Sequence, residues 1–176
     1  MKYQRMSLNK YGRNQNRMPI KFVKGDMFST PMLTSYAHGC NCAGAMGKGV
    51  AVEFKKRWPR MFLSYKEKCK SNLFNPGDVF MWQEQGITVF NLGTQKSWRT
   101  KATLNAVENS LLSMLDIAEE NSITHIGVPR IGAGLGGLLW EDVKSTLFRV
   151  SDGRKVNLIV FEDFVLGLDA TNSIIN

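Results

Sequence analysis

Apolar residues recur along this chain with two different spacings. Between residues 101 and 120 they share one helical face, at Leu104, Val107, Leu111, Leu115 and Ala118, which predicts an amphipathic helix. Helical spacing elsewhere predicts helices over residues 50–58, 60–70 and 140–150. Short apolar runs bounded by turn residues predict strands over residues 20–23, 32–41, 123–129 and 156–164, with a hairpin over residues 77–94 around Gln85-Gly86.

This alternation predicts an α/β sheet with helices on both faces. In such sheets, ligands bind beyond the carboxyl ends of the strands, where loops lead into helices. Three predicted loops leave strands in that sense, at residues 38–49, 93–99 and 130–138. We therefore expect a binding site where these loops converge.

Composition fits one domain. A chain of 176 residues with 43% hydrophobic residues can bury a single core. No apolar run is long enough to span a membrane, and no secretory signal pattern begins the chain. Cys40, Cys42 and Cys69 lack the spacing of a disulfide scaffold, which favours a reducing compartment. We expect a cytoplasmic monomer.

The formal net charge of +8 is unevenly distributed. Residues 1–18 contain five basic residues and no acidic one, within a polar, Asn- and Gln-rich stretch. This pattern predicts a flexible basic leader over residues 1–18, which offers a weak contact for nucleic acid, ahead of a single domain over residues 19–176. The domain itself has 18 basic and 15 acidic residues, a balance that suits a small anionic ligand as well as a polymer.

Two of the three loops are rich in glycine. Gly47 and Gly49 precede a predicted helix, and the loop over residues 130–138 contains four glycines between a strand and a helix. Glycine lets the backbone approach a phosphate, and the N–H groups at the start of a helix favour an anion. Neither loop is a Walker A motif or a Rossmann motif in its usual first strand–helix turn. Each loop alone is equally well explained as a tight turn, but the pair predicts a ligand with two phosphates.

Four segments carry a family resemblance. They read VKGDMF, HGCNCAGAMGKGVAVEFKKRWP, NLGTQKSW and VPRIGAGLGGLLWEDV, at residues 23–28, 38–59, 91–98 and 128–143. In this order they resemble macro domains, which are ADP-ribose-binding α/β modules, over residues 19–161. The most similar branch holds ADP-ribose 1″-phosphate phosphatases and the lysine-dependent ADP-ribosyl hydrolases of proteins and of thymidine in DNA. The resemblance implies a mixed six-stranded sheet between helices.

The resemblance also implies roles for individual residues. Asp26 matches the aspartate that accepts a hydrogen bond from the adenine amino group, and Asn41 matches the asparagine that holds the distal ribose. Phe161, expected after the last strand, is placed like the aromatic residue that packs on adenine. The other implied ligand-binding residues are Met27, Gly47, Lys48, Gly49, Val50, Thr94, Ile131, Gly132, Ala133, Gly134, Leu135 and Gly136, of which residues 131–137 wrap the diphosphate.

Several of these residues have a structural explanation as well. Asp26 can simply close a turn, and Asn41 can cap a loop. Phe161 fits a core position as well as a stacking one. Lys48 can be a solvated side chain of which only the backbone matters.

Two positions depart from the lysine-dependent hydrolases. Gln95 stands where the resemblance places their catalytic lysine, and glutamine can neither form a Schiff base nor act as a nucleophile. Lys96 is one residue further on and would point the other way in an extended segment. Gly136 stands where the protein-deacylating members have an aspartate. Both departures argue against lysine-based chemistry.

The segment HGCNC resembles the phosphatase branch, in which a histidine at the position of His38 serves catalysis. An imidazole near neutral pH can donate a proton or activate water. The alternative is a histidine hydrogen-bonded at a strand end, and His125 is expected to be structural. His38, Cys40 and Cys42 alternate as zinc ligands on a strand could, but a structural zinc site needs four ligands. No metal or cofactor is expected.

We therefore predict an ADP-ribose-binding macro domain that hydrolyses ADP-ribose 1″-phosphate to ADP-ribose and phosphate, with His38 and Asn41 as its catalytic residues. One alternative is a mono-ADP-ribosyl hydrolase that acts on modified protein or nucleic acid and needs Asn41 but not His38. Another is an ADP-ribose reader without catalysis, which fits the residues found at positions 95 and 136.

Overall fold

The structure, a computed structural model, describes residues 19–176, so the predicted leader lies outside the described residues. The strands are β1 (Ile20–Gly25), β2 (Ser35–Asn41), β3 (Val79–Glu84), β4 (Ile87–Gln95), β5 (His125–Pro129) and β6 (Asn157–Phe164). The helices are α1 (Val50–Arg57), α2 (Pro59–Lys70), α3 (Leu104–Glu120), α4 (Trp140–Ser151) and α5 (Thr171–Ile175), with a 3-10 turn η1 (Met27–Ser29). The predicted elements occur in the predicted order, and η1 and α5 are additions to them.

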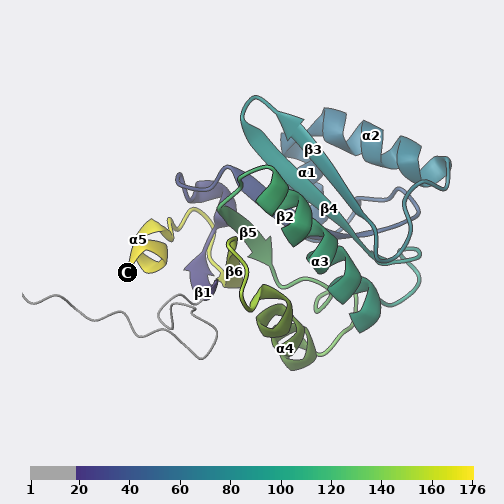
Figure 1. Cartoon of the computed structure of the whole chain (residues 1–176). Coiled ribbons are helices and arrows are strands. Elements are labelled where there is room, and N and C mark those ends of the chain that lie inside the picture. The colour runs from purple at the N-terminus through teal and green to yellow at the C-terminus, as the bar shows by residue number, and fades with distance from the viewer. Residues whose placement is uncertain (1–18) are drawn as a thin grey trace, which may run out of the picture.

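The strands form one sheet in the order β1-β6-β5-β2-β4-β3 (Figure 1). Neighbouring strands pair in parallel except β3, which is antiparallel to β4. The prediction of a mixed six-stranded sheet is therefore confirmed. Because five strands run in the same direction, the loops that follow β1, β2, β4, β5 and β6 leave from one edge of the sheet.

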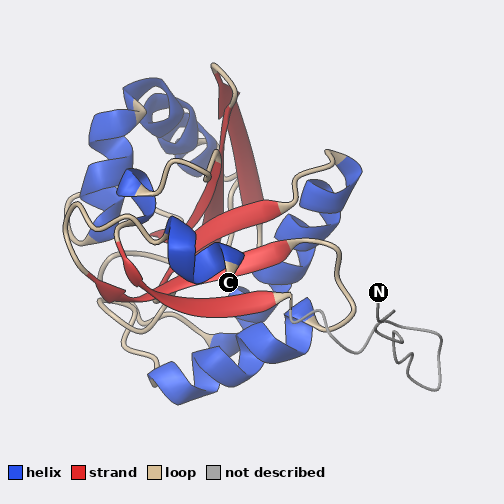
Figure 2. Ribbon diagram, turned by 90° about the vertical axis from the view of Figure 1, so that its left-hand side faces the viewer, coloured by secondary structure: helices blue, strands red, loops and turns tan. Residues whose placement is uncertain are grey.

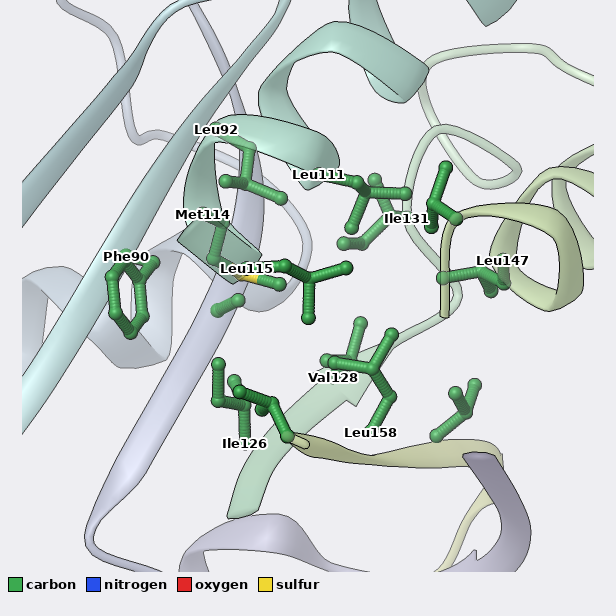
Figure 3. Close-up of a cluster of buried hydrophobic side chains, with 14 of the residues drawn as sticks. Phe90, Leu92, Leu111, Met114, Leu115, Ile126, Val128, Ile131, Leu147 and Leu158 are labelled. Atoms are coloured by element: carbon green, nitrogen blue, oxygen red, sulfur yellow. The ribbon is translucent and has the colours of Figure 1, made fainter. Parts of the chain in front are cut away.

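Helices cover both faces of the sheet, as predicted (Figures 1 and 2). One face packs against α3 and α4, and the other packs against α1 and α2. The predicted apolar face of α3 is buried: Val107, Leu111, Leu115 and Ala118 have no exposed surface. Their side chains meet those of the central strands in one cluster (Figure 3). Within residues 19–176, no helix has the length and apolar character that crossing a membrane requires.

The segment after β6 folds back over the end of β1. Asp26 donates its backbone N–H to the Leu168 carbonyl (2.8 Å), and Val165 donates its own to the Gly25 carbonyl (3.1 Å). The Lys21 ammonium donates to the Ile174 carbonyl at 2.6 Å, which ties α5 to β1. This segment therefore forms one wall of the region beyond the carboxyl end of β1.

Candidate functional site

A cleft of about 510 Å³ lies beyond the carboxyl ends of β1, β2, β5 and β6. Two of the three loops predicted to converge here contribute lining residues, Gly49 from residues 38–49 and Arg130 from residues 130–138, whereas no residue of 93–99 lines the cleft. Five residues predicted to bind the ligand line it, namely Asp26, Met27, Gly49, Val50 and Phe161. The sequence did not indicate seven others, namely Phe28, Glu53, Arg57, Pro129, Arg130, Phe164 and Leu166.

Asp26 closes a turn and also lines the cleft. Its carboxylate accepts hydrogen bonds from the Phe28 N–H (3.0 Å), the Ser29 hydroxyl (3.0 Å) and the Gly167 N–H (3.1 Å). These bonds fix η1 and the segment after β6. A carboxylate has about four acceptor positions, so three bonds leave capacity for one more donor. The structural and ligand-binding explanations of Asp26 are thus compatible.

The first glycine loop joins β2 to α1. Gly49 has a φ of 62°, in the region that favours glycine, and it stands directly before α1 without a side-chain cap. Within the described residues, the amide N–H groups of Gly47, Lys48 and Gly49 have no hydrogen-bond acceptor. The loop therefore presents donors, next to the positive end of a helix dipole, to any anion that enters.

Asn41 holds this loop in shape. Its side-chain oxygen accepts from the backbone N–H groups of Ala43 (3.0 Å) and Ala45 (3.2 Å), and its side-chain amide donates to the Ala45 carbonyl (2.7 Å). Tyr65, on α2, donates its hydroxyl to the Asn41 carbonyl at 2.6 Å. Asn41 thus caps a loop, and one N–H of its side-chain amide remains for a ligand.

The second glycine loop follows β5 and is tightly packed. A Cβ atom added at Gly136 would lie 2.5 Å from the Gly132 carbonyl oxygen, which leaves no room for a side chain. A Cβ atom added at Gly49 would lie 3.5 Å from the Leu135 side chain, so the two loops are neighbours. Within residues 19–176, the N–H groups of Gly134, Leu135 and Gly136 have no hydrogen-bond acceptor. Both loops therefore offer backbone donors in adjacent positions.

His38 lies in the core and not in the cleft. It has no exposed surface, its ring stacks on Phe54 with centroids 3.9 Å apart, and its Nε2 lies 2.9 Å from the Asn91 side-chain oxygen. Burial lowers the pKa of His38 to about 4, although the Asn91 bond opposes this shift. This burial weighs against the predicted catalytic role of His38, because its side chain has no surface open to a ligand.

The burial of His38 predicts a loss of stability in acid. The unfolded chain takes up a proton near the ordinary histidine pKa of 6.5, whereas the folded protein resists protonation down to about pH 4. Stability should therefore fall as the pH drops through this window. We expect wild type to lose roughly 3 kcal/mol more between about pH 7 and pH 4 than His38→Gln, as measured by denaturant unfolding. Equal losses in the two proteins would contradict this explanation.

The structure places four other residues that were predicted to bind the ligand. Thr94 is buried and donates its hydroxyl to the Cys40 carbonyl at 3.2 Å, which gives its side chain a structural role. The side chain of Ile131 is buried in the core and is not open to a ligand. Phe161 lies within β6, in agreement with the strand predicted over residues 156–164 and not after the strand as the resemblance implied, and it is 4% exposed where it lines the cleft. Lys48 is exposed and has no ion pair within the described residues.

The cysteines of this edge are not set up as nucleophiles. Burial raises the pKa of Cys42 to about 12 and that of Cys40 well above its ordinary value, so both remain thiols. Gln95 donates its side-chain amide to the Ser97 carbonyl (2.9 Å), and Lys96 is exposed. Within residues 19–176, no group of three or more histidine, cysteine or acidic side chains is placed to hold a metal ion.

Comparison with known proteins gives consistent results. The Macro domain family model matches residues 37–147. The DNA ADP-ribosyl glycohydrolase of Mycobacterium tuberculosis is 36% identical over 132 residues, which is 73% of this chain and 37% of that protein. The ADP-ribose 1″-phosphate phosphatase of Meyerozyma guilliermondii is 28% identical, covering 73% of this chain and 91% of that protein. The solved macrodomain of Thermus aquaticus DarG superposes with a TM-score of 0.74 at 30% identity, over 81% of this chain and 97% of that one.

Proposed function

Because this chain belongs to the macro domain family, we propose that it binds ADP-ribose in the cleft and hydrolyses ADP-ribose 1″-phosphate to ADP-ribose and phosphate. The relatives described above are named as hydrolases, including one phosphatase of this substrate. This chain spans only 37% of the Mycobacterium tuberculosis relative, and it is only 28% identical to the Meyerozyma guilliermondii relative. The activities of these proteins therefore support the proposal by similarity alone.

The unpaired amide N–H groups of the two neighbouring loops carry this proposal. Gly47, Lys48 and Gly49 offer donors from one loop, and Gly134, Leu135 and Gly136 offer donors from the other. Backbone donors at a helix start are well suited to phosphate oxygens. A diphosphate spans both loops. The adenine then lies in the cleft against Asp26 and Phe161, and the distal ribose lies toward Asn41.

The two glycine loops contain no histidine and no acidic residue over residues 42–49 and 130–139, so neither loop supplies an imidazole or a carboxylate to the reaction. The rate enhancement then comes from two sources: the loops position the substrate, and their N–H donors stabilise the charge that develops on it. Hydrolysis consumes one water molecule, which gives its hydroxyl to one product and its proton to the other. The oxygens of the 1″-phosphate are proton acceptors that the substrate itself brings.

The test is turnover of two substrates by the full chain. ADP-ribose 1″-phosphate is assayed for released phosphate, and an ADP-ribosylated oligonucleotide is assayed for released ADP-ribose, with binding of free ADP-ribose measured by calorimetry. We expect phosphate release. Binding without turnover of either substrate would make the protein a reader, and absence of ADP-ribose binding would refute the proposal.

A second candidate is removal of ADP-ribose from nucleic acid. The 36% identity to a DNA ADP-ribosyl glycohydrolase favours it, although this chain spans only 37% of that relative. The absence of a lysine at position 95 weighs against the lysine-dependent route. Turnover of the modified oligonucleotide alone would establish this second candidate.

Tyr65 is expected to position Asn41 for the reaction. Burial raises the pKa of Tyr65 far above its ordinary value, so its hydroxyl stays a donor to the Asn41 carbonyl. Removing this hydroxyl in Tyr65→Phe should cost about 1 kcal/mol of stability and lower kcat about tenfold, with little change in KM. The measurement is steady-state kinetics with ADP-ribose 1″-phosphate.

Tyr36→Phe is the matched control. Tyr36 is also buried and donates its hydroxyl to a backbone carbonyl, that of Leu33, at 2.7 Å. It should lose similar stability and keep its kcat. An equal loss of kcat in both variants would show that Tyr65 acts through stability alone.

A further inference from the structure

Positive charge is concentrated on α1 and α2. Residues 48–70 contain eight basic and two acidic residues, a net charge of +6. The rest of the domain over residues 19–176 contains ten basic and 13 acidic residues, a net charge of −3. The modest net charge of the domain therefore conceals a strongly basic segment over α1 and α2. The basic residues are Lys48, Lys55, Lys56, Arg57, Arg60, Lys66, Lys68 and Lys70.

Most of these cations are available to an anion. All but Lys68 are exposed. Two of the eight pair with carboxylates: Lys56 with Glu53 at 3.0 Å, and Arg60 with Glu84 of β3 at 2.7 Å. Such exposed pairs are weak and exchange readily with another anion.

A groove lies between the first glycine loop, α1 and α2. It has a volume of about 640 Å³ and is lined by Met46, Gly47, Val52, Lys55, Lys56, Pro59, Phe62 and Leu63. Leu63 is 64% exposed, and the Lys55 ammonium lies 4.5 Å from the centre of the Phe62 ring. We call this surface the basic groove. It combines apolar and aromatic side chains with flanking lysines.

The basic groove adjoins the cleft. Helix α1 separates the two, with Val52, Lys55 and Lys56 on the groove and Val50, Glu53 and Arg57 on the cleft. Gly47 lines the groove, and Gly49, two residues later, lines the cleft. Lys66 of α2 lies against the same loop, since a Cβ atom added at Gly44 would meet its side chain at 3.3 Å.

We infer that the basic groove binds a single strand of nucleic acid, a site separate from the ADP-ribose cleft. Single strands are held by basic side chains that follow the phosphates and by aromatic or apolar surfaces that receive the bases. The basic groove supplies both. A strand held there passes beside the first glycine loop, so its nucleotides lie next to the mouth of the cleft. This inference goes beyond the proposed function and does not depend on it.

The test measures binding of a fluorescein-labelled oligothymidylate of about 12 nucleotides by anisotropy. The test variant is Lys55→Glu with Lys66→Glu in the full chain. The matched control is Lys24→Glu with Lys155→Glu, which changes the net charge equally at exposed positions on β1 and before β6. Binding of free ADP-ribose is measured for each protein and reports that the cleft is folded.

Wild type should bind the oligonucleotide, with an affinity that falls between about 50 and 200 mM salt. The test variant should bind at least about tenfold more weakly, with a log–log salt slope reduced by roughly 1.4 for two lost phosphate contacts, while the control changes less than about twofold. Equal losses in the two variants, or no binding by wild type, would overturn the inference. If ADP-ribose binding persists in that case, the proposed function stands without it.

Discussion

Asn41→Ala should lower kcat/KM for ADP-ribose 1″-phosphate at least about 100-fold, a loss of roughly 3 kcal/mol of transition-state stabilisation. The substitution removes three hydrogen bonds that shape the first glycine loop: two to backbone N–H groups and one to the Ala45 carbonyl. It also removes the N–H that faces the proposed distal ribose. Steady-state kinetics and calorimetry with ADP-ribose measure the two effects separately.

Asn41→Asp is the informative partner variant. Its carboxylate still accepts from Ala43 and Ala45 but no longer donates to the Ala45 carbonyl or to a ligand. We expect intermediate binding of ADP-ribose and turnover reduced about tenfold or more. If Asn41→Ala retained turnover within about threefold of wild type, Asn41 would have no place in the reaction.

Gly136→Ala should weaken ADP-ribose binding at least about tenfold and destabilise the protein by roughly 2 kcal/mol. The added Cβ atom would meet the Gly132 carbonyl oxygen at 2.5 Å and the Ala102 side chain at 3.0 Å, so the backbone must move. The N–H groups of the second loop would then lose the arrangement that receives the diphosphate. Calorimetry and thermal unfolding measure these two losses.

Gly134→Ala provides the control within the same loop. A Cβ atom added at Gly134 meets nothing within 4 Å, so stability and binding should stay near wild type. If both variants bind ADP-ribose normally, the second loop does not hold the ligand. The packing at Gly136 also implies that an aspartate, as in the protein-deacylating relatives, would not fit without rebuilding this loop.

Local patterns in the sequence predicted the helices and strands that pack against the core. The apolar spacing of α3 indicated the face that is buried, and the alternation of strands and helices indicated a sheet covered on both sides. Glycine before α1 and after β5 indicated loops whose backbone N–H groups can bind a phosphate. These features depend on residues close in sequence, so a single chain contains the information.

The position of His38 could not be read in this way. Its exposure depends on Phe54 of α1 and Asn91 of β4, which are 16 and 53 residues away in sequence and cover its two sides. A histidine before a glycine loop has the same local pattern in a core as in an active site. Only the packing of α1 against β2 decides between the two.

The wall of the cleft was missed for a similar reason. Phe164 and Leu166 are 67% and 83% exposed. A sequence pattern does not indicate which residues such exposed apolar side chains lie beside. They line the cleft because the segment after β6 is anchored to Asp26 and Lys21, more than 130 residues earlier. An aromatic residue at the end of the last strand was the one available signal, and it indicated Phe161, which does line the cleft, but not Phe164.

The most direct test of the account is phosphate release from ADP-ribose 1″-phosphate by wild type, His38→Gln and Asn41→Ala near neutral pH, with ADP-ribose binding checked for each. The account predicts release by wild type, release by His38→Gln within about threefold of wild type, and almost none by Asn41→Ala. No release by wild type, or loss of release in a His38→Gln variant that still binds ADP-ribose, would contradict it.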